Sequence, residues 1–215
     1  MDLSFFIFEL IVLVFSVMVH EVAHGFMAEK LGDPTARDAG RLTFNPIKHI
    51  DLFGSVLLPL LLYFSGSQIL LGWAKPVPYN PYNLRDRKYG PLKVALIGPV
   101  ANLILFLVFG LLARLGAGAF SPYLVVLFGF IALMNVNLAV FNLIPIPPLD
   151  GSKILTLILP PRYAMMVERI GMSGILFIFL FLYLFAWIIP LVSLNVFYWV
   201  SGSGVLQIMN RFLGG

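Results

Sequence analysis

The sequence contains no cysteine and very little charge. None of its 215 residues is a cysteine and only 11% are charged, whereas 60% are hydrophobic. Without cysteine there can be no disulfide bond and no thiolate metal site, so any metal would be held by histidine and carboxylate side chains. So few charges cannot cover the surface of a soluble domain of this length, which indicates an integral membrane protein.

The basic residues form no cluster of the kind that binds nucleic acid. The formal net charge is only +4, and the lysines and arginines lie in loops between apolar segments. We therefore expect no nucleic-acid partner, and we expect the lipid bilayer to be the main surrounding of the chain.

Four apolar segments are long enough to cross a hydrocarbon core, which takes about 20 residues. They are residues 3–28, 92–115, 122–145 and 172–200, and a further short membrane segment is expected near 203–213. The first segment lacks the basic start and the small-residue cleavage site of a signal peptide, so we expect it to be a retained span.

No internal repeat and no soluble domain interrupts this series of spans. The sequence therefore predicts a single membrane-embedded domain over residues 1–215, with a catalytic core over about 3–155 and C-terminal spans over about 172–213. The fold class that we predict is an all-α polytopic membrane protein, a bundle of about four to six transmembrane helices.

The lysine and arginine positions predict an orientation. Twelve of the 14 basic residues lie in three loops: after the first span, before the second long span and after the third. By the positive-inside rule these loops are cytoplasmic and the N-terminus is outside.

A full crossing by the apolar stretch 52–71 would place the five basic residues of 72–93 outside. We therefore expect this stretch to be a re-entrant segment that returns to the cytoplasmic side, beside protein or a wet cavity.

Two of the three histidines lie at the inner end of the first span, in the sequence HEVAH. On a helix His20 and His24 share one face, one turn apart, so both imidazoles can reach one cation. Glu21 projects about 100° round the helix, where it can act as general base without being a ligand. The alternative is a chance grouping of polar residues at a helix end. Because ionisable groups within a span mark functional sites, we favour a metal site.

A catalytic zinc site has three protein ligands and one open position, so this site needs a third ligand. His49 and the acidic residues are the candidates. Asp150 is favoured, because the spans at 3–28 and 122–145 both run from outside to inside and bring Asp150 and the histidines to a similar depth. The alternative role for Asp150 is the N-cap of a helix that begins at residue 151.

The segment LLGWAKPVPYNP cannot be helical, because it has prolines at 76, 78 and 81. A peptide bond in a transmembrane helix is shielded by the hydrogen bonds of that helix, so a substrate must unwind before hydrolysis. We expect a short β-strand or hairpin element on the cytoplasmic side, whose edge pairs with unwound substrate. The residues assigned to this substrate-binding edge are Trp73, Ala74, Lys75, Pro76 and Val77. The alternative is a plain surface loop.

These motifs, in this order, resemble the site-2 protease family of intramembrane zinc metalloproteases. HEVAH in a first span and NLIPIPPLDG about 120 residues later match the two ligand motifs of that family. The stretches GRLTFNPIKHID, GWAKPVPYNPYNL and GPVAN (98–102) match accessory motifs of its small bacterial members. The resemblance covers residues 19 to 155, and we expect neither the PDZ insertion nor the cystathionine-synthase-like tail of larger relatives.

The resemblance implies proteolysis of a membrane-embedded substrate helix. One Zn²⁺ per chain would be held by His20, His24 and Asp150. Glu21 would be the general base, and Asn142 would contact the scissile backbone. The alternative for Asn142 is an interhelical hydrogen bond in the membrane.

The resemblance also implies the partners and the location of the enzyme. The substrate would be a transmembrane protein, such as an anti-sigma factor or a signal-peptide remnant. The enzyme would be a multi-pass protein of the cell membrane, with its active site toward the cytoplasmic side. We expect Asn102 to have a structural role, and His49 with Asp51 to order a loop or line the cavity.

Other functions could use similar residues. A transporter of divalent metals would place histidine and aspartate in spans, but it needs several polar stations and access from both sides. A membrane metalloprotease that acts at the cytoplasmic surface would take a glutamate from a later helix as its third ligand, and Glu168 is the only acid after Asp150. A non-catalytic scaffold is disfavoured, because all the reactive groups are present.

Overall fold

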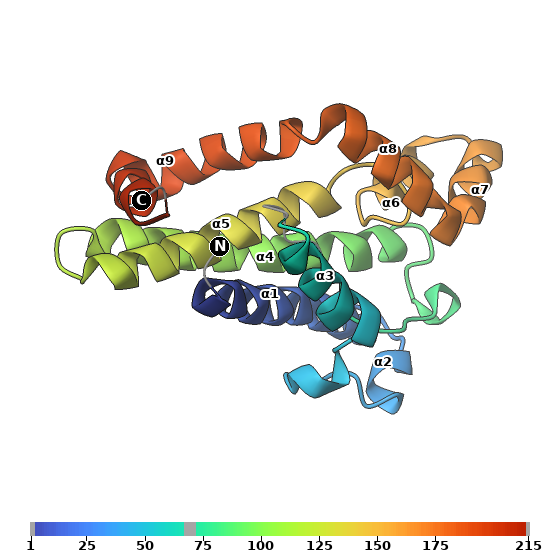
Figure 1. Ribbon diagram of the computed structural model, residues 1–215. Coiled ribbons are helices and arrows are strands. Elements are labelled where there is room, and N and C mark those ends of the chain that lie inside the picture. Colours follow the sequence, from blue (N-terminus) through green and yellow to red (C-terminus); the bar gives the residue numbers. More distant parts are fainter. Residues whose placement is uncertain (1–2, 67–71, 214–215) are drawn as a thin grey trace. The chain divides into compact units, whose positions relative to one another are not determined.

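The computed structural model describes residues 3–66 and 72–213, and most of this chain is helical (Figure 1). Four helices are long and apolar enough to cross a membrane: α1 (Leu3–Lys30), α4 (Gly90–Gly116), α5 (Pro122–Asn142) and most of α9 (Ile188–Leu213). The prediction of an all-α polytopic membrane protein is confirmed. The chain divides into two compact units, residues 1–98 and 99–215, with the boundary inside α4.

The first unit joins the long helix α1 to a series of short helical elements. These are α2 (Thr35–Asp38), η1 (Pro46–Lys48), η2 (Leu52–Leu57), α3 (Leu58–Phe64) and η3 (Pro81–Asn83). Both η1 and η3 begin with the dipeptide Asn-Pro. In each, the asparagine side chain accepts a hydrogen bond from the backbone N–H two residues on, and proline takes the first helical position, where no N–H is needed.

The apolar stretch predicted to be re-entrant begins as a short helical segment. Leu52–Leu57 form a π-helix that continues directly into α3, which ends at Phe64. This segment is too short to cross a hydrocarbon core, which takes about 20 residues. The return of the chain at 67–71 lies outside the described residues, so the re-entrant path stays a prediction.

The predicted β-strand or hairpin element is wrong. Among residues 3–66 and 72–213 no residue lies in a β-strand, and residues 72–80 form an extended, irregular chain. Trp73 N–H donates to Gly54 O at 3.1 Å, and Lys75 N–H donates to His49 O at 2.8 Å. No regular ladder forms, because the groups that bind this chain belong to short helical turns and to side chains and not to a neighbouring strand.

The second unit contains the remainder of α4, then α5, α6 (Ser152–Ile158), α7 (Pro161–Ile170), η4 (Gly171–Gly174), α8 (Ile175–Phe185) and α9. Helix α5 ends at Asn142, three residues before its predicted end, since Pro145 follows and the residue before a proline avoids helical backbone angles. The single span predicted over 172–200 is two helices. The chain turns at Ala186 and Trp187, and Pro190 lies in the first turn of α9, where its missing N–H is tolerated.

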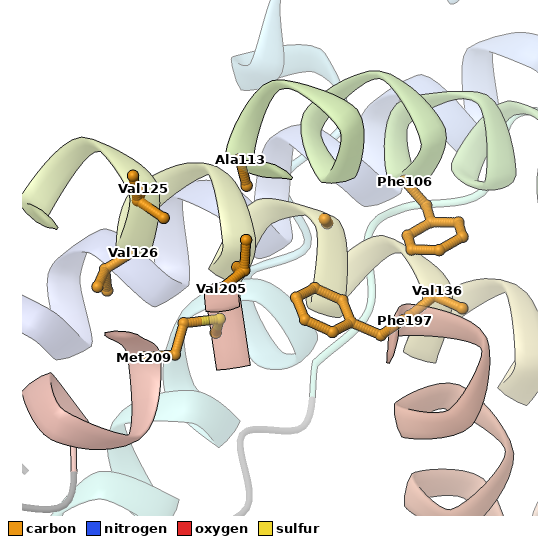
Figure 2. Packing of buried hydrophobic residues seen from close by; sticks show 9 residues of the cluster. Phe106, Ala113, Val125, Val126, Val136, Phe197, Val205 and Met209 are labelled. Carbon is orange, nitrogen blue, oxygen red and sulfur yellow. The ribbon is translucent and has the colours of Figure 1, made fainter. Parts of the chain in front are cut away.

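The core of the second unit lies between α4, α5 and α9 (Figure 2). Its buried residues include Phe106 from α4, Val136 from α5 and Phe197 from α9. Small residues let these helices approach closely, as expected where lipid rather than water surrounds them. A Cβ atom on Gly129 of α5 would lie only 2.6 Å from Met209 Sδ of α9.

Helix α9 is broken just past its middle, at Gly202. Gly202 has φ +83° and ψ 167°, which is not helical. The break leaves carbonyls of the preceding turn without helical partners, and the Arg114 guanidinium donates to two of them, Trp199 O and Val200 O, each at 3.1 Å. A cation at a helix C-terminus also interacts favourably with the helix dipole.

The loop after α5 folds back on the helix end. Gly151 N–H donates to Asn142 O at 2.7 Å, which closes the loop 143–151. A Cβ atom on Gly151 would lie 2.2 Å from Leu143 O, a backbone atom that cannot move aside alone. This position therefore requires glycine.

We expect Gly151→Ala to lower the free energy of unfolding by about 1–3 kcal/mol, the usual cost of forcing extra atoms into a packed site. The midpoint of thermal unfolding in detergent, followed by circular dichroism, measures the change. Gly118→Ala is the matched control, because a Cβ atom there has nothing within 4 Å. Equal midpoints for the two variants would contradict this account of the loop.

Candidate active site

The two histidines of HEVAH lie together on α1, as their spacing predicts. Their Nε2 atoms are 3.0 Å apart, and their rings meet edge to face at 88° with centroids 4.6 Å apart. His20 is 5% exposed and His24 is 9% exposed. Because the two nitrogens face one another in a buried place, one small ligand between them could contact both.

A backbone carbonyl fixes the protonation of His24. Its Nδ1 lies 2.6 Å from Val94 O, at the start of α4. A carbonyl can only accept, so Nδ1 carries the proton and donates it, and the Nε2 of a neutral ring then carries the lone pair that can bind a metal. Metal-binding histidines in proteins usually have such a partner on the second ring nitrogen.

The geometry of the group fits a divalent metal ion. His20, Glu21 and His24 each offer a ligand atom, and these three atoms lie within 4.8 Å of one another. Two nitrogens bound to one tetrahedral zinc at about 2.0–2.1 Å would be about 3.3 Å apart, close to the observed 3.0 Å. Within the described chain, this is the one group of histidine and acidic residues with such spacing.

A glycine of α4 makes room for the two imidazoles. A Cβ atom on Gly98, the first residue of GPVAN, would lie 2.5 Å from His24 Nε2 and 2.6 Å from His20 Cε1. No real Cβ contact is so short, so any larger residue would displace the rings. Gly98 thus lies against the very nitrogen that would bind the metal.

Glu21 is held by the extended chain of residues 72–80. Its Oε2 accepts a hydrogen bond of 2.8 Å from the backbone N–H of Val77. Among the predicted substrate-binding residues, Val77 is thereby brought to the HEVAH motif. The side chain of Val77 is buried as well, at 6% exposed.

The same extended chain is fixed along one edge. In addition to the bonds to Gly54 and His49, the Ser55 hydroxyl donates to Trp73 O at 2.7 Å. Arg41 Nη2 donates to Lys75 O at 2.7 Å and to Pro76 O at 3.3 Å. The N–H groups of residues 73, 75 and 77 and the carbonyls of residues 73, 75 and 76 are therefore all bound by other parts of the first unit.

His49 orders a loop, although not by pairing with Asp51. It is fully buried, and its Nε2 donates to Thr43 O at 2.9 Å. Burial lowers its pKa, because the charged form is poorly solvated there. Asp51 instead caps the π-helix by accepting the N–H of Gly54 at 2.7 Å. His49 is not part of the metal-binding group.

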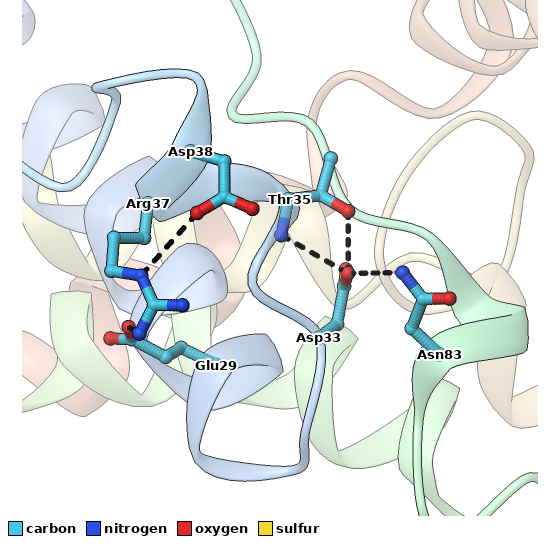
Figure 3. A network of polar contacts seen from close by, with 6 residues as sticks. All are labelled: Glu29, Asp33, Thr35, Arg37, Asp38 and Asn83. Carbon is cyan, nitrogen blue, oxygen red and sulfur yellow. Dashed lines mark hydrogen bonds and ion pairs between the residues drawn. The ribbon is translucent and has the colours of Figure 1, made fainter.

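Asp33, just after α1, binds Thr35 and Asn83 (Figure 3) and anchors the far end of the extended chain through Asn80. Its buried carboxylate accepts hydrogen bonds from Asn80 N–H at 2.6 Å, from Asn83 Nδ2 at 2.9 Å and from Thr35. Burial alone would raise its pKa, but these hydrogen bonds outweigh burial and hold the pKa below its ordinary value. Because the folded-state pKa is depressed, the stabilisation is present at neutral pH and is lost as the pH falls through that value.

Asp150 and Asn142 belong to the second unit. Asp150 lies in the loop between α5 and α6, directly before Gly151, the N-cap residue of α6. Asn142 Nδ2 donates to Leu138 O of its own helix at 3.0 Å. Their roles in the metal site and at the substrate stay predictions.

Asn102 makes the structural contact expected of it. It is fully buried, and its Nδ2 donates to Asn135 Oδ1 at 2.8 Å, which joins α4 to α5. Buried amide groups in a membrane bundle need such partners. Glu168, the rival third ligand, forms an exposed ion pair with Lys153 at 3.4 Å.

The sequence is similar to those of proteins named as zinc metalloproteases or as candidates for that activity. It is 40% identical over 187 residues to YwhC of Bacillus subtilis, named as a candidate zinc metalloprotease, which covers 83% of this chain and 82% of that relative. The pattern of peptidase family M50 matches residues 113–186. The chain belongs to peptidase family M50. It is therefore a metallopeptidase, its four long apolar helices make it a multi-pass membrane protein, and the resemblance to site-2 proteases is confirmed.

More distant members of this M50 group are longer. Rip2 of Mycolicibacterium smegmatis, also named as a candidate zinc metalloprotease, is 33% identical over 139 residues, or 63% of this chain and 51% of that relative. The zinc metalloprotease MJ0392 of Methanocaldococcus jannaschii is 28% identical over 92% of this chain and 50% of its own. These names agree with the predicted zinc cofactor. No solved structure matches the chain.

Three residues at the site have functions that the sequence reasoning missed. They are Gly98, which admits the imidazoles, Arg41, which binds the extended chain, and Val94, whose carbonyl orients His24. Gly98 and Arg41 both lie in the accessory motifs, and their place in these motifs could have identified them from the sequence. The carbonyl of Val94 had none, because any residue supplies the same group.

We expect Gly98→Ala to lose most of its bound metal, since the new methyl group would overlap His24 Nε2. Metal content of the purified protein, measured by inductively coupled plasma mass spectrometry, tests this. Val100→Ala, at an exposed position of the same helix, should retain full metal content. A Gly98→Ala protein with one metal per chain would disprove the close approach.

Proposed function

We propose that the chain is an intramembrane zinc metalloprotease that hydrolyses a peptide bond in or near a transmembrane segment of a membrane protein. The observation that carries the proposal is the pair of buried imidazole nitrogens, 3.0 Å apart on an apolar helix of 28 residues, with Glu21 beside them. Metal ligands and a general base inside a membrane span suit chemistry on a substrate that is itself in the membrane.

The residues that would hold zinc are His20 and His24, through Nε2, together with Asp150. The donor set of two imidazoles and one carboxylate, with one position left open, is typical of catalytic zinc. Zinc bound there supplies Lewis acidity, which polarises a peptide carbonyl and makes water acidic enough to attack at neutral pH.

Glu21 would move the proton in this reaction. One carboxylate oxygen takes a proton from the attacking water, and the same group then gives it to the leaving amine. Asn142 would donate a hydrogen bond to the oxygen of the scissile carbonyl as charge develops there. Its amide carries two N–H groups, of which one donates to Leu138 O.

Residues Trp73–Val77 would bind the unwound substrate. The extended form of this chain supports the proposal, and so do the backbone N–H and carbonyl of Ala74, which make no hydrogen bond with the described residues. A substrate in extended form can pair with that N–H and that carbonyl, which compensates for the helical hydrogen bonds that it gives up.

We further propose a location and a substrate class. The concentration of lysine and arginine in three loops supports the cell membrane, with the N-terminus outside and the active site toward the cytoplasm. The substrates would be transmembrane proteins undergoing regulated intramembrane proteolysis, for example an anti-sigma factor or a signal-peptide remnant.

The test of the mechanism is Glu21→Gln, which keeps the shape of the side chain and removes the base. We expect full zinc content and a loss of cleavage of about 10²–10⁴-fold, the usual contribution of general acid–base catalysis. Cleavage of a model transmembrane peptide in vesicles is the assay. Glu29→Gln, on the same helix and held in a surface ion pair, is the control. Wild-type cleavage by Glu21→Gln would rule out this mechanism.

The third ligand is tested by comparing two acidic residues. We expect Asp150→Ala to lower zinc content well below one per chain, because two ligands bind zinc more weakly than three. Glu168→Ala should keep its zinc, since Glu168 pairs with Lys153 at the surface. Zinc loss from Glu168→Ala, with Asp150→Ala unaffected, would favour the surface-acting class of metalloprotease instead.

A further inference from the structure

We propose that Arg41 is a positioning residue for proteolysis, which keeps the Val77 N–H on the carboxylate of Glu21. Arg41 holds the two carbonyls that precede Val77 in the chain, and Val77 in turn holds Glu21. The inference rests on the proposed role of Glu21 as general base. In addition to binding substrate, the extended chain would then position the carboxylate of Glu21.

Only one of the two carboxylate oxygens of Glu21 is held by a hydrogen bond from the described residues, which suits a general base. Oε2 accepts the Val77 N–H at 2.8 Å, whereas Oε1 accepts no hydrogen bond from the described part of the chain. A backbone N–H that donates to a carboxylate makes a strong, charge-assisted hydrogen bond. Oε2 is therefore fixed in place, and Oε1 is left to receive the proton of water.

The burial of Arg41 is hard to explain unless it has a role. The residue is 9% exposed, and no carboxylate of residues 3–66 or 72–213 forms an ion pair with it. Its Nε is buried without a hydrogen-bond partner. Burying a guanidinium is costly, and unsatisfied buried groups in folded proteins call for a functional explanation. The polar partners that it does have are the carbonyls of Lys75 and Pro76.

The missing side chain of Gly25 in α1 determines how close Val77 can come to Glu21. Gly25 lies one turn after Glu21, and a Cβ atom there would be 2.9 Å from Val77 Cγ1 and 2.5 Å from Leu42 Cδ2. The missing side chain thus admits both Val77 and the neighbour of Arg41. Pro76 and Pro78 restrict the backbone on either side of Val77, so its N–H has little freedom to turn away.

Arg41 is therefore connected to Glu21 only through the backbone of residues 75–77. When the guanidinium is removed, the carbonyls of Lys75 and Pro76 lose their donor, and the segment can shift by a fraction of an ångström. Displacements of about 1 Å in an active site can cost on the order of 100-fold in rate. The reaction rate should therefore fall while the metal ligands, which Arg41 does not touch, stay in place.

The kinetic test compares Arg41→Ala, Arg41→Lys and Arg37→Ala with the wild type. The probe is a fluorogenic model transmembrane peptide in vesicles of phosphatidylcholine and phosphatidylglycerol. We expect Arg41→Ala to lower kcat about 10- to 100-fold with zinc content unchanged and KM changed less than about threefold. Arg41→Lys should recover part of kcat, because an ammonium can still donate to a carbonyl. Arg37→Ala, which removes a surface arginine paired with Glu29, should match the wild type.

A second measurement needs neither activity nor metal. Because proline has no N–H, Val77 carries the only exchangeable backbone amide between Lys75 and Tyr79, so its hydrogen exchange can be read by mass spectrometry. In the metal-free protein, Glu21→Ala should speed this exchange on the order of 10- to 100-fold, since the hydrogen bond to a charged acceptor is lost. Arg41→Ala should speed it in the same direction, and Arg37→Ala should not.

The outcomes separate this inference from the proposed function. A wild-type kcat in Arg41→Ala, a rise confined to KM, or zinc lost in proportion to activity would each overturn the role of Arg41. So would unchanged exchange at Val77 in either Glu21→Ala or Arg41→Ala. If Glu21→Gln abolishes cleavage while Arg41→Ala behaves as wild type, only this inference fails. If Glu21→Gln still cleaves, the proposed mechanism fails first.

Discussion

The hydrogen bond between His24 Nδ1 and the Val94 carbonyl is the interaction on which the site depends. It selects the ring tautomer that exposes the Nε2 lone pair, and it ties α1 to the first turns of α4. Such close contact is possible only because Gly98 leaves room for both imidazoles. In apolar surroundings a polar group without a partner is costly, so one carbonyl both stabilises the histidine and prepares it for metal.

The extended chain of residues 72–80 is ordered by groups from several parts of the first unit. Asp33 anchors its far end, Arg41 its middle, and Gly54 and His49 its beginning. An irregular backbone beside a membrane protein's active site needs this many partners, because it lacks the internal hydrogen bonds of a helix. The segment is therefore held in one conformation without regular secondary structure.

The sequence predicted local features well and long-range ones poorly. The pairing of His20 with His24 follows from helix geometry alone, and the long spans follow from runs of apolar residues. The strand at 73–77 was wrong because its backbone groups bind short helical turns and side chains, and no second strand lies beside it in the described residues. The contact of Val77 with Glu21 joins residues 56 positions apart, and no periodicity could reveal it. Asp150 was inferred from topology and family resemblance, and its place at the metal stays a prediction.

Pro76 and Pro78 also limit pairing between the extended segments of two copies of the protein. An extended backbone with an open edge invites pairing with the same segment of another molecule, which is how many sheets grow into aggregates. Pro76 and Pro78 have no N–H, so two of the three residues 76–78 have no backbone donor to offer such a partner. A second copy of this segment would therefore find few donors to pair with, which disfavours the growth of a sheet along it.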